Sequence, residues 1–440
     1  MKTLLTMFAF VAVLCSCLVS AAQSATPERP SQQPAYSVYY SPPGRLDALF
    51  AAFMDAIPYA SIESYQIQHL LLNAREFWGQ ALPKPSPEAL VAMEGRFGDM
   101  PEYWQLMYVY STAGDEDEKD IKYLEKACEV APYDPVSQYY FAYYGLYSGQ
   151  KESDDDYSVE ATLGHYDITA RAAEGLLKAA EMDGQNAFYY FQAALGAMQD
   201  SGCESAVALL KQSNEQKVNV YVALFPFSYM VEHRELLPQQ YPRKYLLLMA
   251  LADEGLLPTY LKTKDMYKQL IVGVSLSGNV DWLTTAYRSA CRISMQDSGA
   301  SITAISGLIM SGIVINGASE IGYGEDDMNE RRALEFAESE KTRITDELAF
   351  SMRDFMDKLQ SDFGYTGAED YVPIMGIPAP FVIGDPRFKE YLEALWEYEA
   401  DWRSSTLAEM TSQISALLVL DFANPAEFIK QFSAPTHNSQ

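Results

Sequence analysis

Residues able to carry out chemistry are few in this sequence and are widely separated. The four histidines, His69, His165, His233 and His437, lie far from one another along the chain. A metalloprotease helix requires two histidines four residues apart, and a zinc site gathers its ligands at short, regular spacings. The histidines therefore predict neither a catalytic base nor a bound metal.

A serine nucleophile is not supported either. The segment Gly273-Val-Ser-Leu-Ser-Gly278 places glycines near two serines, but a hydrolase elbow requires a glycine two residues before and two residues after the serine. The segment also falls within a helical pattern, and the chain has no Gly-rich loop of the kind that binds phosphates. We therefore expect no catalytic residue and no cofactor.

Three adjacent carboxylates, Asp154, Asp155 and Asp156, form a short acidic run. The ligands of a calcium loop alternate with other residues, so adjacent carboxylates favour a solvated acidic loop over a cation site. Such a loop can bind a basic partner, or it can be a tolerated surface insertion without a role. Both interpretations remain open at this point.

The composition describes a folded and strongly acidic chain. Of 440 residues, 48% are hydrophobic, and the formal net charge is −28. This excess of negative charge disfavours binding to nucleic acid or to an anionic membrane surface, and it favours solubility or a basic partner. A chain of this length exceeds what one compact core usually serves, whereas a helical solenoid avoids that limit because each unit packs on its neighbours.

The first residues have the pattern of a targeting segment. Met1-Lys2 is followed by an apolar run from Leu4 to Leu14 and by the small residues Ser20-Ala21-Ala22, as in a signal peptide spanning residues 1–22. A second interpretation is that Leu14-Cys15-Ser16-Cys17 is a bacterial lipoprotein box with a lipid on Cys17. Both predict export to the periplasm or cell envelope, with membrane contact only through the lipid anchor.

The cysteines give no sign of a disulfide framework. Outside the leader only Cys128, Cys203 and Cys291 remain, an odd number at wide spacing. Because each lies on or beside an apolar helical stretch, we expect buried, unreactive thiols.

The segments before residue 101 predict a tether followed by helices. Residues 23–43 are rich in Pro, Ser and Gln, which is typical of a flexible linker. Residues 44–100 carry helical patterns, one of them beginning at Ser86-Pro87 as a side-chain cap with proline in the first turn. We expect these helices to cover one end of the fold.

Residues 101–215 repeat a pattern of large and small apolar residues. Each copy predicts two short helices, and Pro or Gly ends the second helix of the first two copies. Small residues let two helices approach closely, and large residues fill the space on the neighbouring unit. The residues that carry the pattern are Trp104, Leu124, Ala127 and Pro132 in the first copy, Phe141, Ala142, Gly145, Ala172, Leu176 and Gly184 in the second, and Tyr190, Ala193, Ala194, Ala206 and Leu210 in the third.

This pattern resembles the tetratricopeptide repeat, a helical hairpin of roughly 34 residues that stacks on copies of itself. The resemblance implies an all-α fold, a right-handed α-α superhelix (a tetratricopeptide-like helical solenoid) with additional packed helices at both ends. Gly145 departs from the family pattern, where a large residue is usual, and Gly184 replaces Pro. The spacing of 52 residues from Pro132 to Gly184 corresponds to one repeat plus an insertion at about Gln150–Tyr166.

Helical patterns continue through residues 216–432. The uncharged stretch Ser298–Ala318 carries small or polar residues throughout, which favours a buried helix over a membrane span. A long helix from Met328 to about Asp362 mixes acidic and basic residues, as on a solvated face with weak ion pairs. Residues 433–440 predict a disordered tail.

Three classes of function are consistent with these patterns. The first is a scaffold whose stacked hairpins hold a protein or peptide partner, which the net charge predicts to be basic. The second is an envelope lipoprotein that binds a small ligand such as a glycan, since the 31 tyrosines would suit stacking on sugars. The third is an enzyme with an unrecognised site. Exposed rings clustered in one cleft would favour the glycan over the scaffold.

The leader generates the first testable prediction. We expect the mature chain to lack it, because the apolar run and the small residues ending at Ala22 match a processed export signal. Intact mass of the envelope-extracted protein distinguishes cleavage after Ala22 from cleavage before Cys17 with added acyl mass. An uncleaved chain recovered from the cytoplasm would contradict the export hypothesis.

Overall fold

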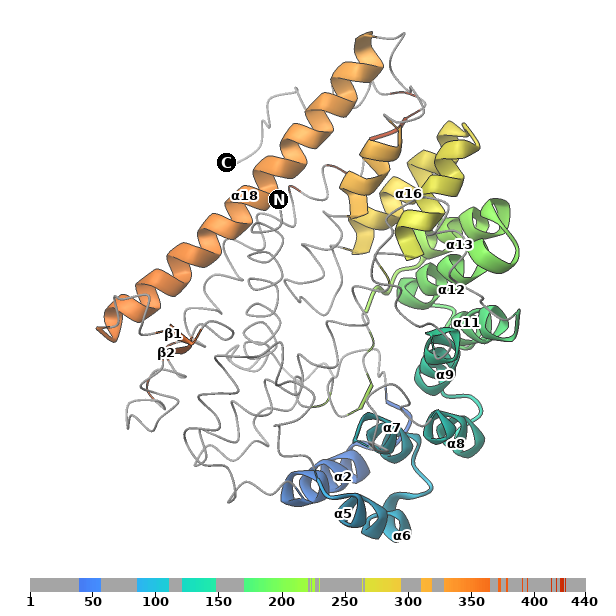
Figure 1. Cartoon of the computed structure of the whole chain (residues 1–440), viewed down its shortest axis with the longest axis vertical. Helices are drawn as coiled ribbons and strands as arrows, with labels where there is room; N and C mark the ends of the chain where they lie inside the picture. Colours follow the sequence, from blue (N-terminus) through green and yellow to red (C-terminus); the bar gives the residue numbers. More distant parts are fainter. Residues whose placement is uncertain are drawn as a thin grey trace, which may run out of the picture. The chain divides into compact units, whose positions relative to one another are not determined.

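The computed structural model of the protein describes part of the chain. The described residues are 39–56, 85–110, 121–147, 170–220, 266–293, 310–318 and 328–364, with shorter pieces and single positions at 222, 224–225, 229, 263, 371–372, 377–378, 390, 394, 413, 417, 420–422 and 424. These residues are predominantly helical, so the predicted all-α class is confirmed (Figure 1). One two-stranded antiparallel ladder joins β1 (Tyr371–Val372) to β2 (Ile377–Pro378).

Two compact units divide the chain, and each is built from separate stretches of sequence. Unit 1 comprises Met1–Gly149, Val222–Thr259 and Arg353–Trp402, and unit 2 comprises Gln150–Tyr221, Tyr260–Met352 and Arg403–Gln440. Each unit is described by itself below.

Most of the described helices of unit 1 begin at a proline, which favours a first helical turn. They are α2 (Pro43–Ala56), α5 (Pro87–Ala92), α6 (Glu94–Phe97), α7 (Pro101–Tyr110), α8 (Lys122–Val130) and α9 (Pro135–Tyr147). Four of them start at a proline, whose missing N–H has no partner in the first turn in any case. At α5 the cap is as predicted, because Ser86 Oγ accepts a hydrogen bond from the Ala89 N–H at 3.1 Å. Helix α8 packs against both α7 and α9.

In unit 2 four described helices pack in sequence. They are α11 (Ala170–Met182), α12 (Ala187–Asp200), α13 (Cys203–Glu215) and α16 (Val280–Ile293), and each packs against the next (Figure 1). Between α12 and α13, Gly202 has a φ of 85°, a conformation that residues with a Cβ rarely adopt. The chain therefore makes a tight turn at Ser201-Gly202.

Small residues set the closest helix contacts of unit 2. A Cβ on Gly196 of α12 would lie 2.8 Å from Leu176 Cδ1 of α11, and one on Gly273 would lie 2.6 Å from Cys203 Sγ. These distances are shorter than real Cβ contacts, so larger residues would push the helices apart.

The buried helix predicted within Ser298–Ala318 is described from residue 310 to residue 318. Met310, Val314 and Ala318 are each 0% exposed, and a Cβ on Gly317 would lie 2.6 Å from Ser275 Oγ. Most of this segment is therefore buried, whereas Asn316 is exposed. Within the described ranges, no helix is both long enough and apolar enough to cross a membrane.

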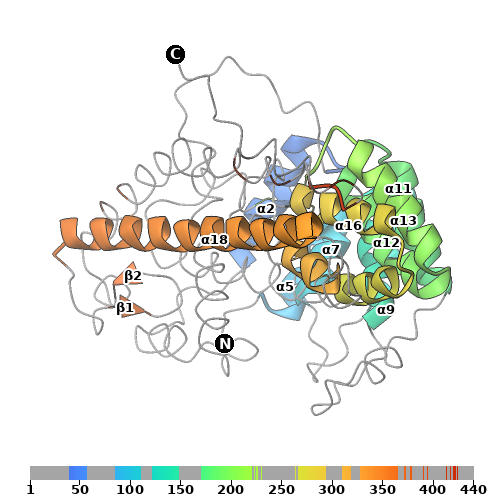
Figure 2. The same cartoon turned by 90° about the horizontal axis from the view of Figure 1, so that it is seen from above.

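The long charged helix has the bounds that its sequence predicts. Helix α18 runs from Met328 to Asp362 without a break, as both views show (Figures 1 and 2). Its exposed ion pairs, such as Arg331 with Glu335 at 3.0 Å, join residues one turn apart. Such pairs contribute only about 0.3–0.5 kcal/mol each to stability, so they are not the main interactions that hold the helix in place.

Several predictions concern residues outside those described. They are the leader with Cys17, the acidic run at Asp154–Asp156 and the tail at 433–440. For the predicted linker, Tyr39 to Pro42 are described, and α2 begins at Pro43. These last linker residues belong to the folded part of unit 1.

Overpacking at Ala194 tests the helix pairing of unit 2. Ala194 of α12 is 0% exposed. We therefore expect Ala194→Phe to destabilise the protein by about 1–3 kcal/mol in chemical denaturation. As a control, Ala208→Phe adds the same ring at an exposed position of α13 and should change stability by less than about 0.5 kcal/mol. Equal effects of the two substitutions would mean that the packing of α12 is misassigned.

Candidate functional site

Unit 1 holds a cluster of polar side chains inside its helical core. Glu102 and Gln105 lie on α7. Asp134 directly precedes α9, and Ser137 lies in its first turn. Their exposed fractions are 2%, 3%, 2% and 0%. Buried polar groups are costly unless each is hydrogen-bonded, so their partners decide what this cluster can do.

Glu102 fixes the segment that precedes α2. Its Oε1 accepts hydrogen bonds from the backbone N–H groups of Tyr40 and Ser41, both at 2.9 Å. Its Oε2 accepts one from Ser41 Oγ at 2.6 Å. Both carboxylate oxygens are therefore occupied by the end of the predicted linker.

Asp134 caps α9. Its Oδ1 accepts the N–H of Val136 at 3.2 Å, and its Oδ2 accepts the N–H of Ser137 at 3.0 Å together with the Ser137 hydroxyl. These are the N–H groups that a helix leaves unbonded at its start. Gln105 Nε2 donates a further hydrogen bond to Asp134 Oδ2 at 3.3 Å.

Gln105 and Tyr140 extend the cluster to residues far along the chain. Gln105 Oε1 accepts the backbone N–H of Phe225 at 3.0 Å, and the Tyr140 hydroxyl donates to the Val222 carbonyl at 2.7 Å. The inner faces of α7 and α9 are thus bonded to the backbone of unit 1's own second stretch.

Burial raises the pKa of Asp134 to about 6, since desolvation penalises the charged carboxylate. Hydrogen bonds from Ser137 and Val136 act in the opposite direction, and the charge of Glu102 adds to the increase. A carboxyl group with such a pKa could serve as a general acid or base. Here, however, the oxygens are occupied by intramolecular donors and shielded from solvent. The cluster therefore holds the fold and offers no position for a substrate.

The residues of the predicted repeat pattern lie mostly in the core. Those with an exposed fraction of 8% or less are Trp104, Leu124, Ala127, Ala142, Ala172, Leu176, Ala193, Ala194, Ala206 and Leu210. Phe141 and Tyr190 are half-buried, Pro132 and Gly184 are exposed, and Gly145 lies within α9. The pattern thus locates packing positions and does not gather these residues into a binding site.

Aromatic side chains are largely core residues in both units. Tyr139, Tyr143 and Tyr189 are exposed by 1% or less. Among the described residues, the strongly exposed rings are Tyr40, Tyr133 and Phe350, which belong to three separate segments. No described set of tyrosines therefore forms an open surface for stacking a sugar.

The thiols and acids supply no metal site within the described ranges. Cys128, Cys203 and Cys291 carry no disulfide, and only Cys291 is fully buried. Burial raises the pKa of the Cys291 thiol to about 12, which keeps it protonated and unreactive at neutral pH. Cys128 and Cys203 are only partly buried, so the expected full burial applies to one thiol of the three.

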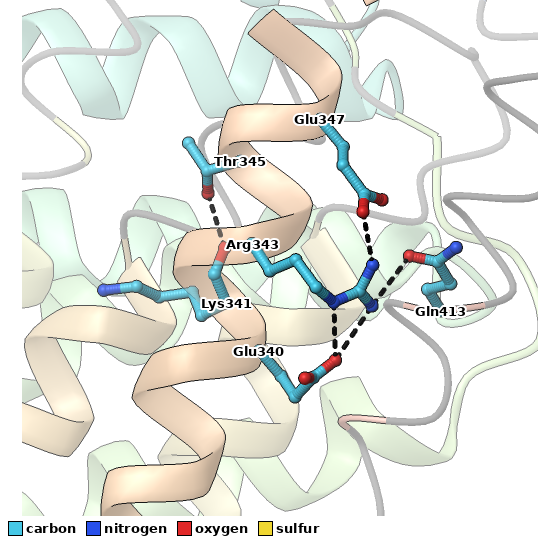
Figure 3. A network of polar contacts seen from close by, with 6 residues as sticks. All are labelled: Glu340, Lys341, Arg343, Thr345, Glu347 and Gln413. Atoms are coloured by element: carbon cyan, nitrogen blue, oxygen red, sulfur yellow. Dashed lines mark hydrogen bonds and ion pairs between the residues drawn. The ribbon is translucent and has the colours of Figure 1, made fainter. Parts of the chain in front are cut away.

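An exposed charged network lies on α18. Arg343 donates to Glu340 Oε2 at 3.0 and 2.8 Å, to Glu347 Oε1 at 2.7 Å and to Gln413 Oε1 at 3.2 Å (Figure 3). These hydrogen bonds raise the pKa of the guanidinium. The network fixes the direction of Arg343 on a face that is otherwise open to solvent.

The described helices define an all-α protein, and both oxygens of Glu102 and of Asp134 in its polar cluster are hydrogen-bonded. No family model, no curated protein and no solved structure matches this chain.

The position of Asp134 predicts a pH dependence of stability. Its pKa is about 6 in the folded protein against an ordinary value of 3.8 for an aspartate, so the folded state binds the proton more tightly. The stabilisation is complete below pH 3.8 and is lost as the pH rises through about 6, by on the order of 3 kcal/mol. In Asp134→Asn, urea unfolding between pH 4 and 7.5 should lack this decline.

An exposed carboxylate provides the control for this prediction. Asp281→Asn on α16 should leave the decline in place, because Asp281 lies on the surface of the other unit. If the wild type shows no loss of stability between pH 4 and 7, the buried carboxyl is ionised throughout and the predicted direction is wrong.

Proposed function

We propose that this chain is an exported bacterial helical-repeat protein that acts as a protein-interaction scaffold in the cell envelope. In this proposal its helical hairpins stack as a right-handed α-α superhelix, with further helices packed at both ends. The partner is a protein or peptide of basic character, and membrane contact occurs only through a lipid on Cys17. No enzymatic activity and no cofactor are part of the proposal.

The pairing of helices along the sequence supports this architecture. In unit 1, α8 packs against α7 and α9, and in unit 2, α12 packs against α11 and α13. The contacts use small residues, such as Gly196 against Leu176, and buried alanines, such as Ala194. Stacked hairpins joined in this way provide extended surfaces for a macromolecular partner.

The observation that carries the proposal is a contrast between two groups of helices. Other parts of the chain cover α7 and α12, whereas α8, α11 and α13 carry exposed charged residues. Every residue of α7 except Val109 is buried. In unit 2, Gln192 of α12 bonds to Thr263 at 3.4 Å, and the ring of Phe191 lies 5.6 Å from that of Tyr267. The chain itself thus occupies the inner sides of α7 and α12.

Partners must therefore use the outward faces of the other helices. Charged residues alternate in sign there, and the exposed ones include Lys122, Glu125, Lys126 and Glu129 on α8, Glu174 and Lys178 on α11, and Glu204, Lys211 and Glu215 on α13. Such surfaces suit protein contacts more than enclosure of a small molecule, because ligand sites are concave and mostly apolar. The burial of Tyr139, Tyr143 and Tyr189 weighs in the same direction against a glycan site.

The acidic run at Asp154–Asp156 stays a predicted partner-binding loop, and replacing it tests the scaffold. Proteins of the cell envelope are cross-linked to the mature chain in place and are captured together with it. The experiment is repeated with a variant in which a short Gly-Ser link replaces Ser153–Ser158. We expect the wild type to capture a protein partner and the variant to capture less of it. The deficit should shrink at high salt, where charge is already screened.

Two controls separate binding from folding. Stability of the variant should stay within about 0.5 kcal/mol of the wild type, as for surface changes away from packed sites. The triple substitution of Asp154, Asp155 and Asp156 by Asn keeps the loop length and removes only charge, so it should reproduce the loss. Recovery of glycans without any protein partner would contradict the proposed function.

A further inference from the structure

Phe350 is an apolar ring that unit 2 leaves in solvent. Its exposed fraction is 71%. The buried stripe of α18 is formed by Ala333, Ala337 and Ile344, each 0% exposed, at the spacing of one helix face. Phe350 follows Ile344 by six residues, roughly 240° further round the helix, so it cannot join that stripe.

The two neighbours that precede this ring on the same face are acidic. Asp346 precedes Phe350 by four residues and Glu347 by three, and both are exposed. Side chains at these spacings are adjacent on a helix surface, with Cβ atoms about 5–6 Å apart. No ion pair joins Asp346 to any of the described residues, whereas Glu347 pairs with Arg343 at 2.7 Å.

The two cations that precede Asp346 most closely on α18 have carboxylate partners of their own. Arg343 is bonded to Glu340, Glu347 and Gln413 (Figure 3). Lys341 points away from Arg343 and pairs with Glu338 at 2.7 Å (Figure 3). Neither of these cations pairs with Asp346, whose carboxylate lies one helical turn before the exposed phenyl ring.

We propose that the Asp346–Phe350 face of α18 binds a basic side chain, arginine above all, on a protein partner. A guanidinium stacks on a phenyl ring by cation–π and apolar contact while its N–H groups donate to a nearby carboxylate. A second copy of this chain does not suit the face, because molecules with a net charge of −28 repel one another. This inference rests on the proposed scaffold function and specifies the side chain by which the partner is bound.

A fluorine label tests the chemistry directly. Phe350 alone is replaced by 4-fluorophenylalanine in the full mature chain, and the probe is the peptide Gly-Ser-Arg-Arg-Ser-Gly. We expect a saturable change of the fluorine resonance, absent when citrulline, a neutral analogue of similar shape, replaces both arginines. Asp346→Asn should weaken binding at least fivefold.

Glu335 provides the matched control for that substitution. It is an exposed carboxylate on the same helix, so Glu335→Gln removes the same charge far from the ring and should change binding less than twofold. A resonance that never saturates, or equal losses from Asp346→Asn and Glu335→Gln, overturns the proposal.

Photo-crosslinking in the envelope tests the partner. A crosslinking residue is placed at position 350 and, for comparison, at position 276, where Leu276 is 77% exposed on another helix. We expect position 350 to crosslink a protein at a peptide containing arginine or lysine, and Asp346→Asn to abolish this product. Position 276 should not yield it.

The outcomes separate this inference from the scaffold proposal. If the wild type still captures a protein partner but position 350 crosslinks nothing, or crosslinks a second copy of the chain, the face is wrong and the scaffold remains. If no protein is captured in either experiment, both proposals fail.

Discussion

A buried carboxylate must find hydrogen-bond donors, and this requirement shapes unit 1 more than any other interaction. Glu102 takes its donors from the backbone at Tyr40 and Ser41, and Asp134 takes them from the first turn of α9. Gln105 joins the cluster to Phe225. Leaving one of these groups unpaired would cost about 1–3 kcal/mol or more, so the cluster permits few alternative arrangements of the helices.

Unit 2 depends on a different constraint, the close approach of helices at small residues. Gly196, Gly273 and Gly317 each lie where a Cβ would meet a neighbouring side chain at less than 3.0 Å. Because no Cβ intervenes there, the neighbouring side chains approach the glycine backbone and make dispersion contacts that are individually weak and collectively large. The helix arrangement is thus specified differently in the two units. Unit 1 uses directional hydrogen bonds, and unit 2 uses the close fit of side chains against small residues.

Local patterns explain how much of this fold the sequence predicts. The all-α class, the cap at Ser86, the turn at Gly202 and the bounds of α18 all follow from residues within a few positions of one another. The polar cluster was not predicted, although Asp134-Pro135 is a recognisable helix start. Nothing near Glu102 indicates that its partners lie 61 and 62 residues away, because pairing at that distance depends on the packed fold. The exposed ring of Phe350 was missed for a related reason, since periodicity alone does not show which face of a charged helix is covered.

The hydrogen bond between Gln105 and the Phe225 N–H also constrains when unit 1 can finish folding during synthesis. The two residues are 120 positions apart, and chains are synthesised at roughly 5–20 residues per second. Gln105 is therefore made about 6–24 s before the backbone N–H that its side-chain oxygen accepts. The hydroxyl of Tyr140 waits in the same way for the carbonyl of Val222, 82 residues later. Unit 1 cannot complete its core as a purely N-terminal domain would, so its folding has to wait for a stretch of chain that begins after α11, α12 and α13 of unit 2 have been made.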